Sequence, residues 1–471
     1  IGIDDATEEM IALAITQDPK VLFHLMLGWL NQRAILTEQG ERNRTTLLMS
    51  HERIRSAKVT EKQFNKMVRC WMYCSYASYH QKHDIKETLN RMFVQRLDEV
   101  GLKGKTPIYR AKKRPRMLVV HERFLQRHAM FRCYAPYIRA LKDHFYLVAL
   151  AEQTQIDDAS HEIFDEIITV NAKKQPFSDV IAVATNVNPD IIYYPSIGMS
   201  LWTVLLANLR IATVQIAMSG HPSTTRSLQI DHIILPKIAG EVQNLYSENV
   251  LYTDAPVEYE MHPQMPEFLG PRKTSNDEIL HVAVNSKVMK LSFRLLNICK
   301  RLSRESEKRL HFHFFPGEQG LFFDGITSSI KQHLSNSTIY GYLEYPTFLH
   351  KIGQCDLSLA AFPFGNTNST VDTCILGIPT VVHCGPELPA KTDKLVLEKA
   401  GYPNFLVCDD DEKYFQTALR LINDKSLRDN IIGESDFRLV RDRLFNSAKG
   451  DSPTQSIAEQ FLKAYRSASK N

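Results

Sequence analysis

A polar loop at residues 362–372 carries the strongest chemical signal in this sequence. It reads Phe-Pro-Phe-Gly-Asn-Thr-Asn-Ser-Thr-Val-Asp and lies between an apolar run and a helical stretch that ends near Gly377. Gly365 gives the turn conformational freedom, and the start of the following helix supplies N–H groups and a positive dipole end that suit a diphosphate. A simple cap needs one polar residue, whereas five follow Gly365. The loop therefore predicts an anion site, with Asp372 in the first helical turn placed to accept hydrogen bonds from sugar hydroxyls.

A lysine-containing segment is the second candidate for binding phosphate. The segment Asn-Ser-Lys-Val-Met-Lys at 285–290 follows an apolar run, and Lys290 is expected to open the next helix. Its ammonium group could neutralise the phosphates of a donor. Without the loop at 362–372, a surface lysine would be the default interpretation.

Histidines follow strand-like runs in the first half of the chain. His121 and His128 come after the run Met117–Val120, and His221 stands in Met-Ser-Gly-His-Pro-Ser-Thr-Thr at 218–225. Because the pKa of histidine lies near working pH, such a residue could act as a general base or orient an acceptor. Each one alone would more often be structural, but their common position at strand ends favours a shared cleft.

Two other patterns resemble metal ligands, and we expect neither to bind a metal. His311 and His313 lie on one face of a predicted strand, but no third ligand can be named. The acidic run at 409–412 directly precedes a helical stretch, so its carboxylates are expected to cap that helix. The sequence predicts no metal site and no bound cofactor.

The elements that must position these residues change character near residue 105. Up to about residue 100, apolar positions recur at three- and four-residue spacing with few Gly or Pro, which predicts an α-helical domain at 1–105. Beyond it, short apolar runs alternate with helical stretches, as in parallel βαβ units. A first lobe at 117–250 is expected to hold strands at Met117–Val120, Phe145–Ala149, Ile167–Val170, Ile191–Tyr194, Ala212–Ala217 and Ile230–Leu235. After a Pro-rich break at 252–276, a second lobe at 277–450 is expected to hold strands at Ile279–Asn285, His311–Phe315, Thr338–Tyr342, Leu357–Phe362, Thr380–Cys384 and Phe405–Cys408, and a C-terminal helix follows at 451–471.

The predicted fold class is therefore α/β, with two facing Rossmann-like lobes preceded by an all-α domain. In open α/β sheets, ligands bind at the carboxyl ends of the strands, which places the candidate residues in the cleft between the lobes. Neither lobe has a Gly-x-Gly-x-x-Gly after its first strand, which counts against a nicotinamide or flavin enzyme.

Composition narrows the setting. A net charge of +4 over 471 residues does not indicate nucleic-acid binding, and the basic run between Lys103 and Arg116 is interpreted as a linker. Eight cysteines without a Cys-x-x-Cys pair indicate reduced thiols and a cytoplasmic protein. The first residues carry no basic segment of a signal peptide, and the most apolar stretch, 201–218, is interrupted by polar residues, so no transmembrane segment is expected.

Two of these runs resemble a known family. Met-Ser-Gly-His-Pro-Ser-Thr-Thr at 218–225 and Phe-Pro-Phe-Gly-Asn-Thr-Asn at 362–368 are similar to bacterial cytoplasmic N-glycosyltransferases that modify high-molecular-weight adhesins. These enzymes are relatives of the O-GlcNAc transferase catalytic domain, and the similarity spans about residues 117–465. It implies a GT-B fold behind a helical domain. It also implies an inverting, metal-independent transfer of glucose or galactose from a uridine diphosphate (UDP) sugar to asparagine in Asn-x-Ser/Thr sequons.

The resemblance also implies roles for single residues. It places Lys290 on the donor phosphates, Phe364, Asn368 and Asp372 around the donor, and Asn366 and Thr367 in the phosphate loop. It matches His221 to a cleft histidine of the family, His128 to an acceptor-side histidine, and Gln319 to a nearby family glutamine. Tyr342 stands where the family has a histidine beside the nucleotide base, and Ser369 stands where the family commonly has glycine.

Other functions stay open at this point. A histidine base suits a hydroxyl acceptor more easily than the weakly nucleophilic amide of asparagine, so transfer to Ser, Thr or a glycan is an alternative. A nucleotide-sugar epimerase of the same fold is another, although it would have no need of the helical domain. A non-catalytic accessory subunit is the third, and the complete phosphate loop argues against it. Expected partners are a UDP-sugar donor and an acceptor protein such as an adhesin.

Overall fold

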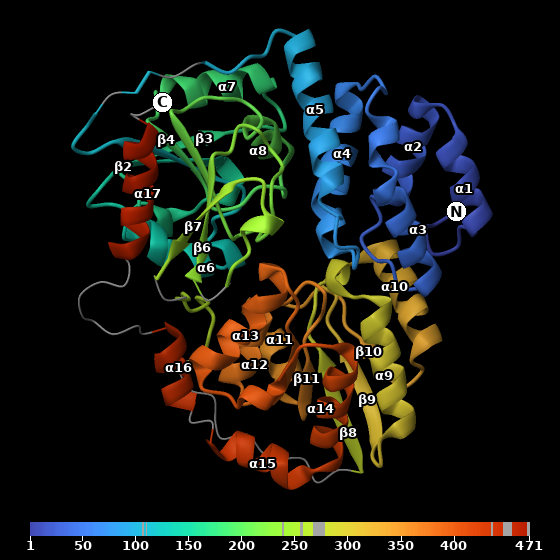
Figure 1. Cartoon of the computed structure of the whole chain (residues 1–471). Helices are drawn as coiled ribbons and strands as arrows, with labels where there is room; N and C mark the ends of the chain where they lie inside the picture. The colour runs from blue at the N-terminus through green and yellow to red at the C-terminus, as the bar shows by residue number, and fades with distance from the viewer. Residues whose placement is uncertain are drawn as a thin grey trace.

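The computed structural model describes residues 1–105, 108–109, 111–237, 240–254, 258–266, 278–434, 437–445 and 455–468. These residues form a helical domain and two α/β lobes, each built on its own parallel sheet (Figure 1). The predicted class, with two Rossmann-like lobes behind an all-α region, is confirmed.

In the N-terminal helical region, polar capping residues mark where several of the helices begin. The side chains of Thr7 and Thr37 accept hydrogen bonds from Met10 N and Gly40 N, and Thr60 forms a capping box with Gln63. Short 3₁₀ turns lie at His51–Ile54 and Cys74–Tyr76. The helices are α1 (Glu8–Thr16), α2 (Pro19–Trp29), α3 (Glu38–Met49), α4 (Glu61–Tyr73) and α5 (Asp84–Glu99).

Over the described residues, the first lobe holds a sheet of seven strands in the order β3-β2-β1-β4-β5-β6-β7, and all its pairings are parallel. The strands are β1 (Arg116–His121), β2 (Tyr146–Glu152), β3 (Glu166–Val170), β4 (Ile191–Tyr194), β5 (Val214–Met218), β6 (His232–Pro236) and β7 (Asn249–Thr253). Helices α6 (Ala129–Arg139), α7 (Phe177–Asn186) and α8 (Leu201–Leu206) connect them. Apolar side chains cover both faces of the sheet, as expected for parallel strands.

The prediction for the first lobe missed β7. This strand lies at the edge of the sheet beside β6, and most of its residues are partly exposed. An edge strand needs no continuous apolar run, so Asn249–Thr253 gave a weak sequence signal.

Over the described residues, the second lobe holds a sheet of six parallel strands in the order β10-β9-β8-β11-β12-β13, and all six fall on predicted runs. The strands are β8 (Ile279–Val284), β9 (Arg309–Phe314), β10 (Ser337–Ile339), β11 (Leu357–Leu359), β12 (Thr380–His383) and β13 (Val407–Cys408). The helices are α9 (Phe293–Glu305), α10 (Gly320–His333), α11 (Tyr345–Gly353), α12 (Asn368–Ile375), α13 (Leu388–Ala400), α14 (Asp411–Asn423), α15 (Lys425–Glu434) and α16 (Phe437–Phe445).

The chain then returns to the first lobe. Helix α17 (Gln455–Ser467) packs Phe461 against Phe145 and Tyr193, with ring centroids 6.2 and 4.9 Å apart. Figure 1 shows α17 beside the strands of the first lobe, away from α16. The C-terminal helix therefore ties the end of the chain to the lobe that the chain left about two hundred residues earlier.

The helical domain contacts both lobes. Arg33 pairs with Glu318 of the second lobe at 2.7 Å, and the hydroxyl of Ser75 lies 2.9 Å from Nε2 of His221 in the first lobe. Lys82 adds a second contact with the second lobe through Glu387 at 3.0 Å. The domain thus spans the junction of the lobes on one side of the molecule (Figure 1).

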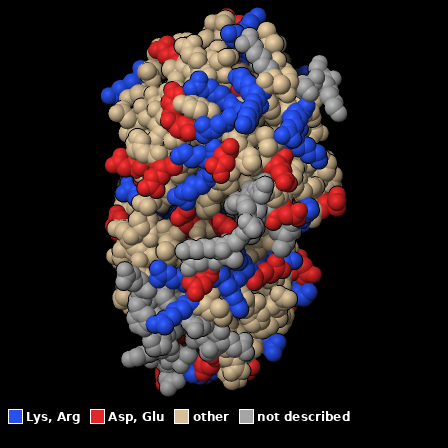
Figure 2. Space-filling view, turned by 90° about the vertical axis from the view of Figure 1, so that its left-hand side faces the viewer, with Lys and Arg blue, Asp and Glu red and all other residues tan. Residues whose placement is uncertain are grey.

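Several features lie outside the cleft. Asp410 caps α14 through Lys413 N at 2.7 Å, and none of the eight cysteines, all within the described residues, forms a disulfide. Lys112, Arg114 and Arg116 pair with carboxylates of the first lobe, and Arg110 lies outside the described residues. Figure 2 shows Lys and Arg interspersed with Asp and Glu on the face it presents. Within the described part of the chain, no helix is long and apolar enough to cross a membrane, and no group of three or more His, Cys, Asp and Glu could hold a metal ion.

Candidate functional site

Two neighbouring cavities lie between the lobes, one of about 570 Å³ (the large cavity) and one of about 200 Å³ (the small cavity). The loops after β1, β8 and β10 and the start of α12 enclose the large cavity. Helix α6, the loop after β5 and helix α13 enclose the small one. Ala129 at the start of α6 and Asn368 at the start of α12 line both. The carboxyl ends of the two sheets therefore meet at this site, as the fold class predicts.

Asp393 of α13, which is remote from the predicted phosphate loop in sequence, fixes that loop through direct hydrogen bonds. Its carboxylate accepts hydrogen bonds from Asn366 N at 2.8 Å, Thr367 N at 2.6 Å and Thr370 Oγ1 at 2.7 Å. A Cβ at position 365 would lie 2.6 Å from Asp393 Oδ2 and 2.8 Å from the carbonyl oxygen of Pro389. Gly365 is therefore required for close packing. Asp393 was missed because nothing in its local sequence links it to a loop 26 residues earlier.

This arrangement changes which N–H groups are open to a ligand. Those of Asn366 and Thr367 point to Asp393, whereas Asn368 and Ser369, the first two residues of α12, direct theirs out of the helix end. Both of these residues line the large cavity. The predicted anion site is thus narrowed to Asn368 and Ser369, while Asn366 and Thr367 line the small cavity.

Two lysines after β8 divide between the cavities. Lys287 lines the large cavity, and its side chain runs over Gly317, where any side chain would collide with it. Lys290 lines the small cavity, donates a hydrogen bond to the carbonyl oxygen of Gly365, and lies 5.1 Å from the ring centre of Phe364. Burial lowers the pKa of Lys290 to about 8. The prediction that Lys290 opens a helix was wrong, because it ends the short 3₁₀ turn Val288–Lys290.

Asp372 joins the two lobes. Its Oδ1 accepts hydrogen bonds from Arg132 of α6 at 3.2 Å and from the Tyr345 hydroxyl at 2.8 Å. Burial raises the pKa of Asp372, and the Arg132 guanidinium opposes that rise. The predicted position in the first turn was wrong, because α12 begins at Asn368 and Asp372 is its fifth residue. The carboxyl group still lines the large cavity, but Arg132 and Tyr345 were not found from the sequence.

His128 lines the large cavity, and a backbone contact determines which of its ring nitrogens carries the proton. Its Nδ1 accepts a hydrogen bond from Met130 N at 3.1 Å and so caps α6. Burial, together with the charges of Arg123 and Lys287, lowers the pKa of His128 to about 4. A neutral ring with Nδ1 as acceptor carries its proton on Nε2. The geometry therefore favours a hydrogen-bond donor over the general base considered from the sequence.

His221 lies behind the site. Among the described residues that line the small cavity, its neighbours Gly220 and Pro222 are present and His221 is not. Its ring stacks on Phe364 with centroids 5.9 Å apart and contacts Ser75 of the helical domain. Burial lowers its pKa well below the usual value. His221 thus supports Phe364, which itself lines the small cavity.

Of the two remaining predicted residues, Tyr342 lines the large cavity and Gln319 does not. Tyr342 is half exposed and lines this cavity beside Phe315 and Phe348, which the sequence did not reveal. Gln319 is exposed at the start of α10 and lines neither cavity. The Pro-rich break at 252–276 also contributes to the site, since Tyr259 lines the small cavity and His262 the large one.

Similarity to known proteins agrees with this geometry. Residues 12–97 match the family described as HMW1 domain 2. Over 364 residues the chain is 30% identical to UDP-glucose:protein N-beta-glucosyltransferase of Actinobacillus pleuropneumoniae serotype 5b (strain L20), covering 74% of this chain and 58% of that protein. The protein of the same name from serotype 7 (strain AP76) matches with the same identity and coverage. The chain thus spans 58% of the length of these curated relatives.

A solved structure shows the same fold. A mutant O-GlcNAc transferase of Thermobaculum terrenum has a TM-score of 0.67 and 12% identity, covering 98% of this chain and 92% of that one. At this identity the likeness concerns the fold, which is GT-B. Together these matches confirm the resemblance found in the sequence, since the chain has homologues named protein N-beta-glucosyltransferases and its residues 12–97 match HMW1 domain 2.

Proposed function

We propose that this homologue of the UDP-glucose:protein N-beta-glucosyltransferases transfers glucose from UDP-glucose to asparagine side chains of proteins. The observation that carries the proposal is the large cavity between the lobes. Its lining combines the open N-terminus of α12 and the cations Lys287, Arg123 and Arg127 with the aromatic side chains Tyr342, Phe315 and Phe348. A diphosphate with an attached base needs these two kinds of surface.

The donor is proposed to bind with its diphosphate at Asn368 and Ser369. Lys287 supplies positive charge from the large cavity and Lys290 from the small one, and Nε2–H of His128 donates a hydrogen bond to a phosphate oxygen. The uracil ring lies toward Tyr342 and Phe315, and Asp372 accepts a hydrogen bond from a ribose hydroxyl. This placement directs the hexose toward Asn368, where the large cavity meets the small one.

Transfer is proposed to invert the anomeric carbon. The asparagine amide nitrogen forms a bond to that carbon from the face opposite the diphosphate, and the bond between the carbon and the phosphate oxygen breaks. Its electron pair goes to UDP, and the amide loses one proton, which the departing diphosphate can accept. Because Nδ1 of His128 already accepts a backbone N–H, His128 acts on the donor and not as the base.

We further propose that the reaction needs no divalent ion, that the acceptor asparagine lies in an Asn-x-Ser/Thr sequon, and that the protein acts in the cytoplasm on an acceptor such as an adhesin. Positive side chains and a helix N-terminus can neutralise a leaving diphosphate in place of a metal. The names of the homologues support a protein acceptor.

Intact-mass spectrometry tests the proposal. Peptides with an Asn-x-Thr sequon and matched peptides with Ser or Thr alone are incubated with the chain, UDP-glucose or UDP-galactose, and EDTA. We expect a mass gain of one hexose on asparagine from UDP-glucose. Modification of Ser or Thr alone would move the acceptor to a hydroxyl. Donor consumption without peptide modification would favour a glycan acceptor or an epimerase, and no turnover would favour an accessory subunit.

A further inference from the structure

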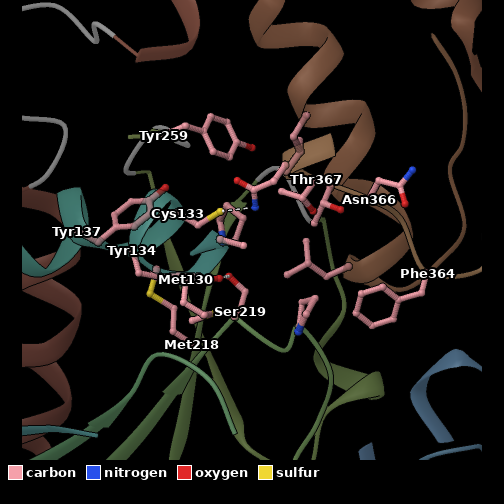
Figure 3. A pocket seen from close by; sticks show the side chains of 18 of the residues that line it. Met130, Cys133, Tyr134, Tyr137, Met218, Ser219, Tyr259, Phe364, Asn366 and Thr367 are labelled. Atoms are coloured by element: carbon pink, nitrogen blue, oxygen red, sulfur yellow. Dashed lines mark hydrogen bonds between the residues drawn. The ribbon is translucent and has the colours of Figure 1, made fainter. Parts of the chain in front are cut away.

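The small cavity differs from the donor site in the chemistry of its wall. Side chains from α6, the loop after β5 and the segment before the second lobe enclose it on one side, as Figure 3 shows. Phe364 and Thr367 of the second lobe lie across the space from them, and the side chain of Asn366, on the same loop, points away to the right. The apolar part of the wall consists mainly of Met130, Tyr134, Tyr137, Met218, Tyr259 and Leu395. These side chains are all buried, with exposed fractions from 4% to 7%.

The small cavity lies between separate hydrophobic cores that do not pack fully against each other. Met130, Tyr134 and Met218 belong to the core of the first lobe, and Tyr259 packs with the core of the second. Leu395 of α13 is buried beside the opening between them. Protein interiors pack closely, and an empty apolar space forfeits dispersion contacts along its wall. An apolar group that fills it would regain those contacts.

The wall is poorly suited to hold a whole hexose. Among the described residues that line the cavity, none is Asp or Glu. The hydroxyl of Tyr134 already bonds to Ser219 Oγ at 3.3 Å, and that of Tyr137 bonds to the backbone of Glu258. Among the described lining residues Lys290 carries the one charged side chain, and Ser219, Thr253, Thr367 and Thr392 contribute hydroxyl groups. Asn368 also lines the large cavity, so the two cavities meet there. The proposed donor position puts the hexose at Asn368, which leaves the apolar part of the wall, the apolar end of the cavity, for a different group.

We propose that the apolar end of the small cavity binds a bulky apolar or aromatic side chain of the acceptor polypeptide, within two residues of the asparagine that receives the sugar. The inference rests on the proposed function, because it requires the acceptor asparagine to reach the hexose at Asn368. Asn368 lines the small cavity together with Met130, Tyr134 and Leu395, so a neighbouring side chain of the acceptor can enter the space between them. The cavity then selects among sequons by their flanking residues.

Kinetics with a set of peptides tests this subsite. Each peptide carries one Asn-x-Thr sequon, and Phe, Leu, Ala or Asp is placed in turn at the two positions on either side of the asparagine. For wild type, we expect kcat/KM to be about tenfold higher for Phe or Leu than for Ala at one of these positions. Leu395→Ala enlarges the cavity and should move the optimum toward Phe. Leu395→Phe shrinks it and should move the optimum toward Ala.

Leu397→Ala is the matched control, because Leu397 lies on the same helix but packs in the core of the second lobe, away from the cavity. It should lower the melting temperature and leave the ranking of peptides unchanged. The KM for UDP-glucose, measured with the Ala peptide, reports on the donor side. If the Leu395 variants alter that KM and not the ranking, the cavity holds the hexose and the inference is overturned.

Two further outcomes separate this inference from the proposed function. Transfer to asparagine with equal kcat/KM for all flanking residues would overturn the subsite and leave the glucosyltransferase in place. Failure to modify any asparagine, while UDP still binds by calorimetry, would overturn the proposed function and the subsite with it. Opposite shifts of the optimum in the two Leu395 variants would establish the subsite.

Discussion

Two helix N-termini border the interlobe site, and their ends are completed in different ways. In the first lobe, α6 is capped by its own chain, because Nδ1 of His128 accepts the N–H of Met130 at 3.1 Å. In the second lobe, the cap residue of α12 is Thr367, which has a φ of +57° and whose side chain makes no capping bond to the described residues. The backbone N–H groups before α12 are taken instead by Asp393 of another helix.

The difference shows what separates an anion site from an ordinary helix start. A local cap such as His128 satisfies the N–H groups that a ligand would use. The remote carboxylate of Asp393 holds the loop and a strained Thr367 in place, while Asn368 and Ser369, the first two residues of α12, line the large cavity. The contrast supports the proposal that the donor phosphates bind at α12 and that His128 donates a supporting hydrogen bond.

The largest effect on stability is expected from removing the ion pair that joins the two helices. Arg132 of α6 and Asp372 of α12 form an ion pair at 3.2 Å whose side chains are 4% and 5% exposed. Arg132→Ala would leave the Asp372 carboxyl buried without its cation, so we expect the free energy of unfolding to fall by about 4 kcal/mol. Urea denaturation measures this change.

Arg139→Ala is the control on the same helix. Arg139 pairs with Glu260 near the surface, where the two side chains are 41% and 31% exposed. Solvent screens such a pair, and its loss should lower the free energy of unfolding by less than about 1 kcal/mol. Equal losses in the two variants would show that the ion pair of Arg132 does not join the lobes as described.

The next effect tests the remote hold on the loop. Asp393→Ala removes the acceptor for three hydrogen bonds and leaves buried N–H groups of Asn366 and Thr367 unpaired. We expect a loss of about 3 kcal/mol in the free energy of unfolding and a drop of about a hundredfold in UDP affinity, measured by calorimetry. Asp410→Ala, which removes an exposed cap of α14, should cost about 1 kcal/mol and leave UDP affinity unchanged. If UDP binds Asp393→Ala as tightly as wild type, the loop does not need its remote carboxylate.

The same contrast explains how far the sequence could predict this molecule. Period and turn residues located the helical domain and most strands, because these signals are local, and Phe362 to Asp372 stood out because its polar residues are contiguous. Asp393, Arg132 and Tyr345 act through contacts that span tens to hundreds of residues, and no spacing rule reveals them.

The histidines show the same limit in reverse. His128 and His221 follow strands as predicted, but His121 is the last residue of β1 and packs buried against Phe124. The role of each histidine depends on which way its ring turns. His128 turns to its own helix and His221 to Ser75 of the helical domain, and neither direction can be read from neighbouring residues. Gln319 followed a loose local match and lies on the surface.

A smaller effect, on the pH dependence of UDP affinity, distinguishes Lys287 from Lys290. The pKa of Lys290 is lowered to about 8, so its ammonium is charged at pH 7 and neutral above pH 9. Since a phosphate is attracted only to the charged form, UDP affinity should fall about tenfold as pH rises from 7 to 9. Calorimetry across this range should show the decline in wild type and in Lys287→Met, which binds more weakly throughout. Lys290→Met should bind weakly with a flat profile, and a retained decline would assign the titration to another group.

The smallest effect concerns the closed helix end, where stability and chemistry can be separated at His128. His128→Ala removes the cap of α6 and should lower the free energy of unfolding by about 1 kcal/mol, whereas His128→Asn keeps a side-chain acceptor for Met130 N and should restore most of it. Neither variant carries the Nε2–H donor, so both should lose glucosyl transfer to a similar degree. Because the pKa of His128 is about 4, the ring is neutral above that pH. A plot of wild-type kcat against pH should therefore show no ionisation near pH 6.5 that belongs to His128, and His128→Asn should remove none there. Full activity of His128→Asn would mean that the residue serves only as a cap, and the two helix ends would then differ in structure alone.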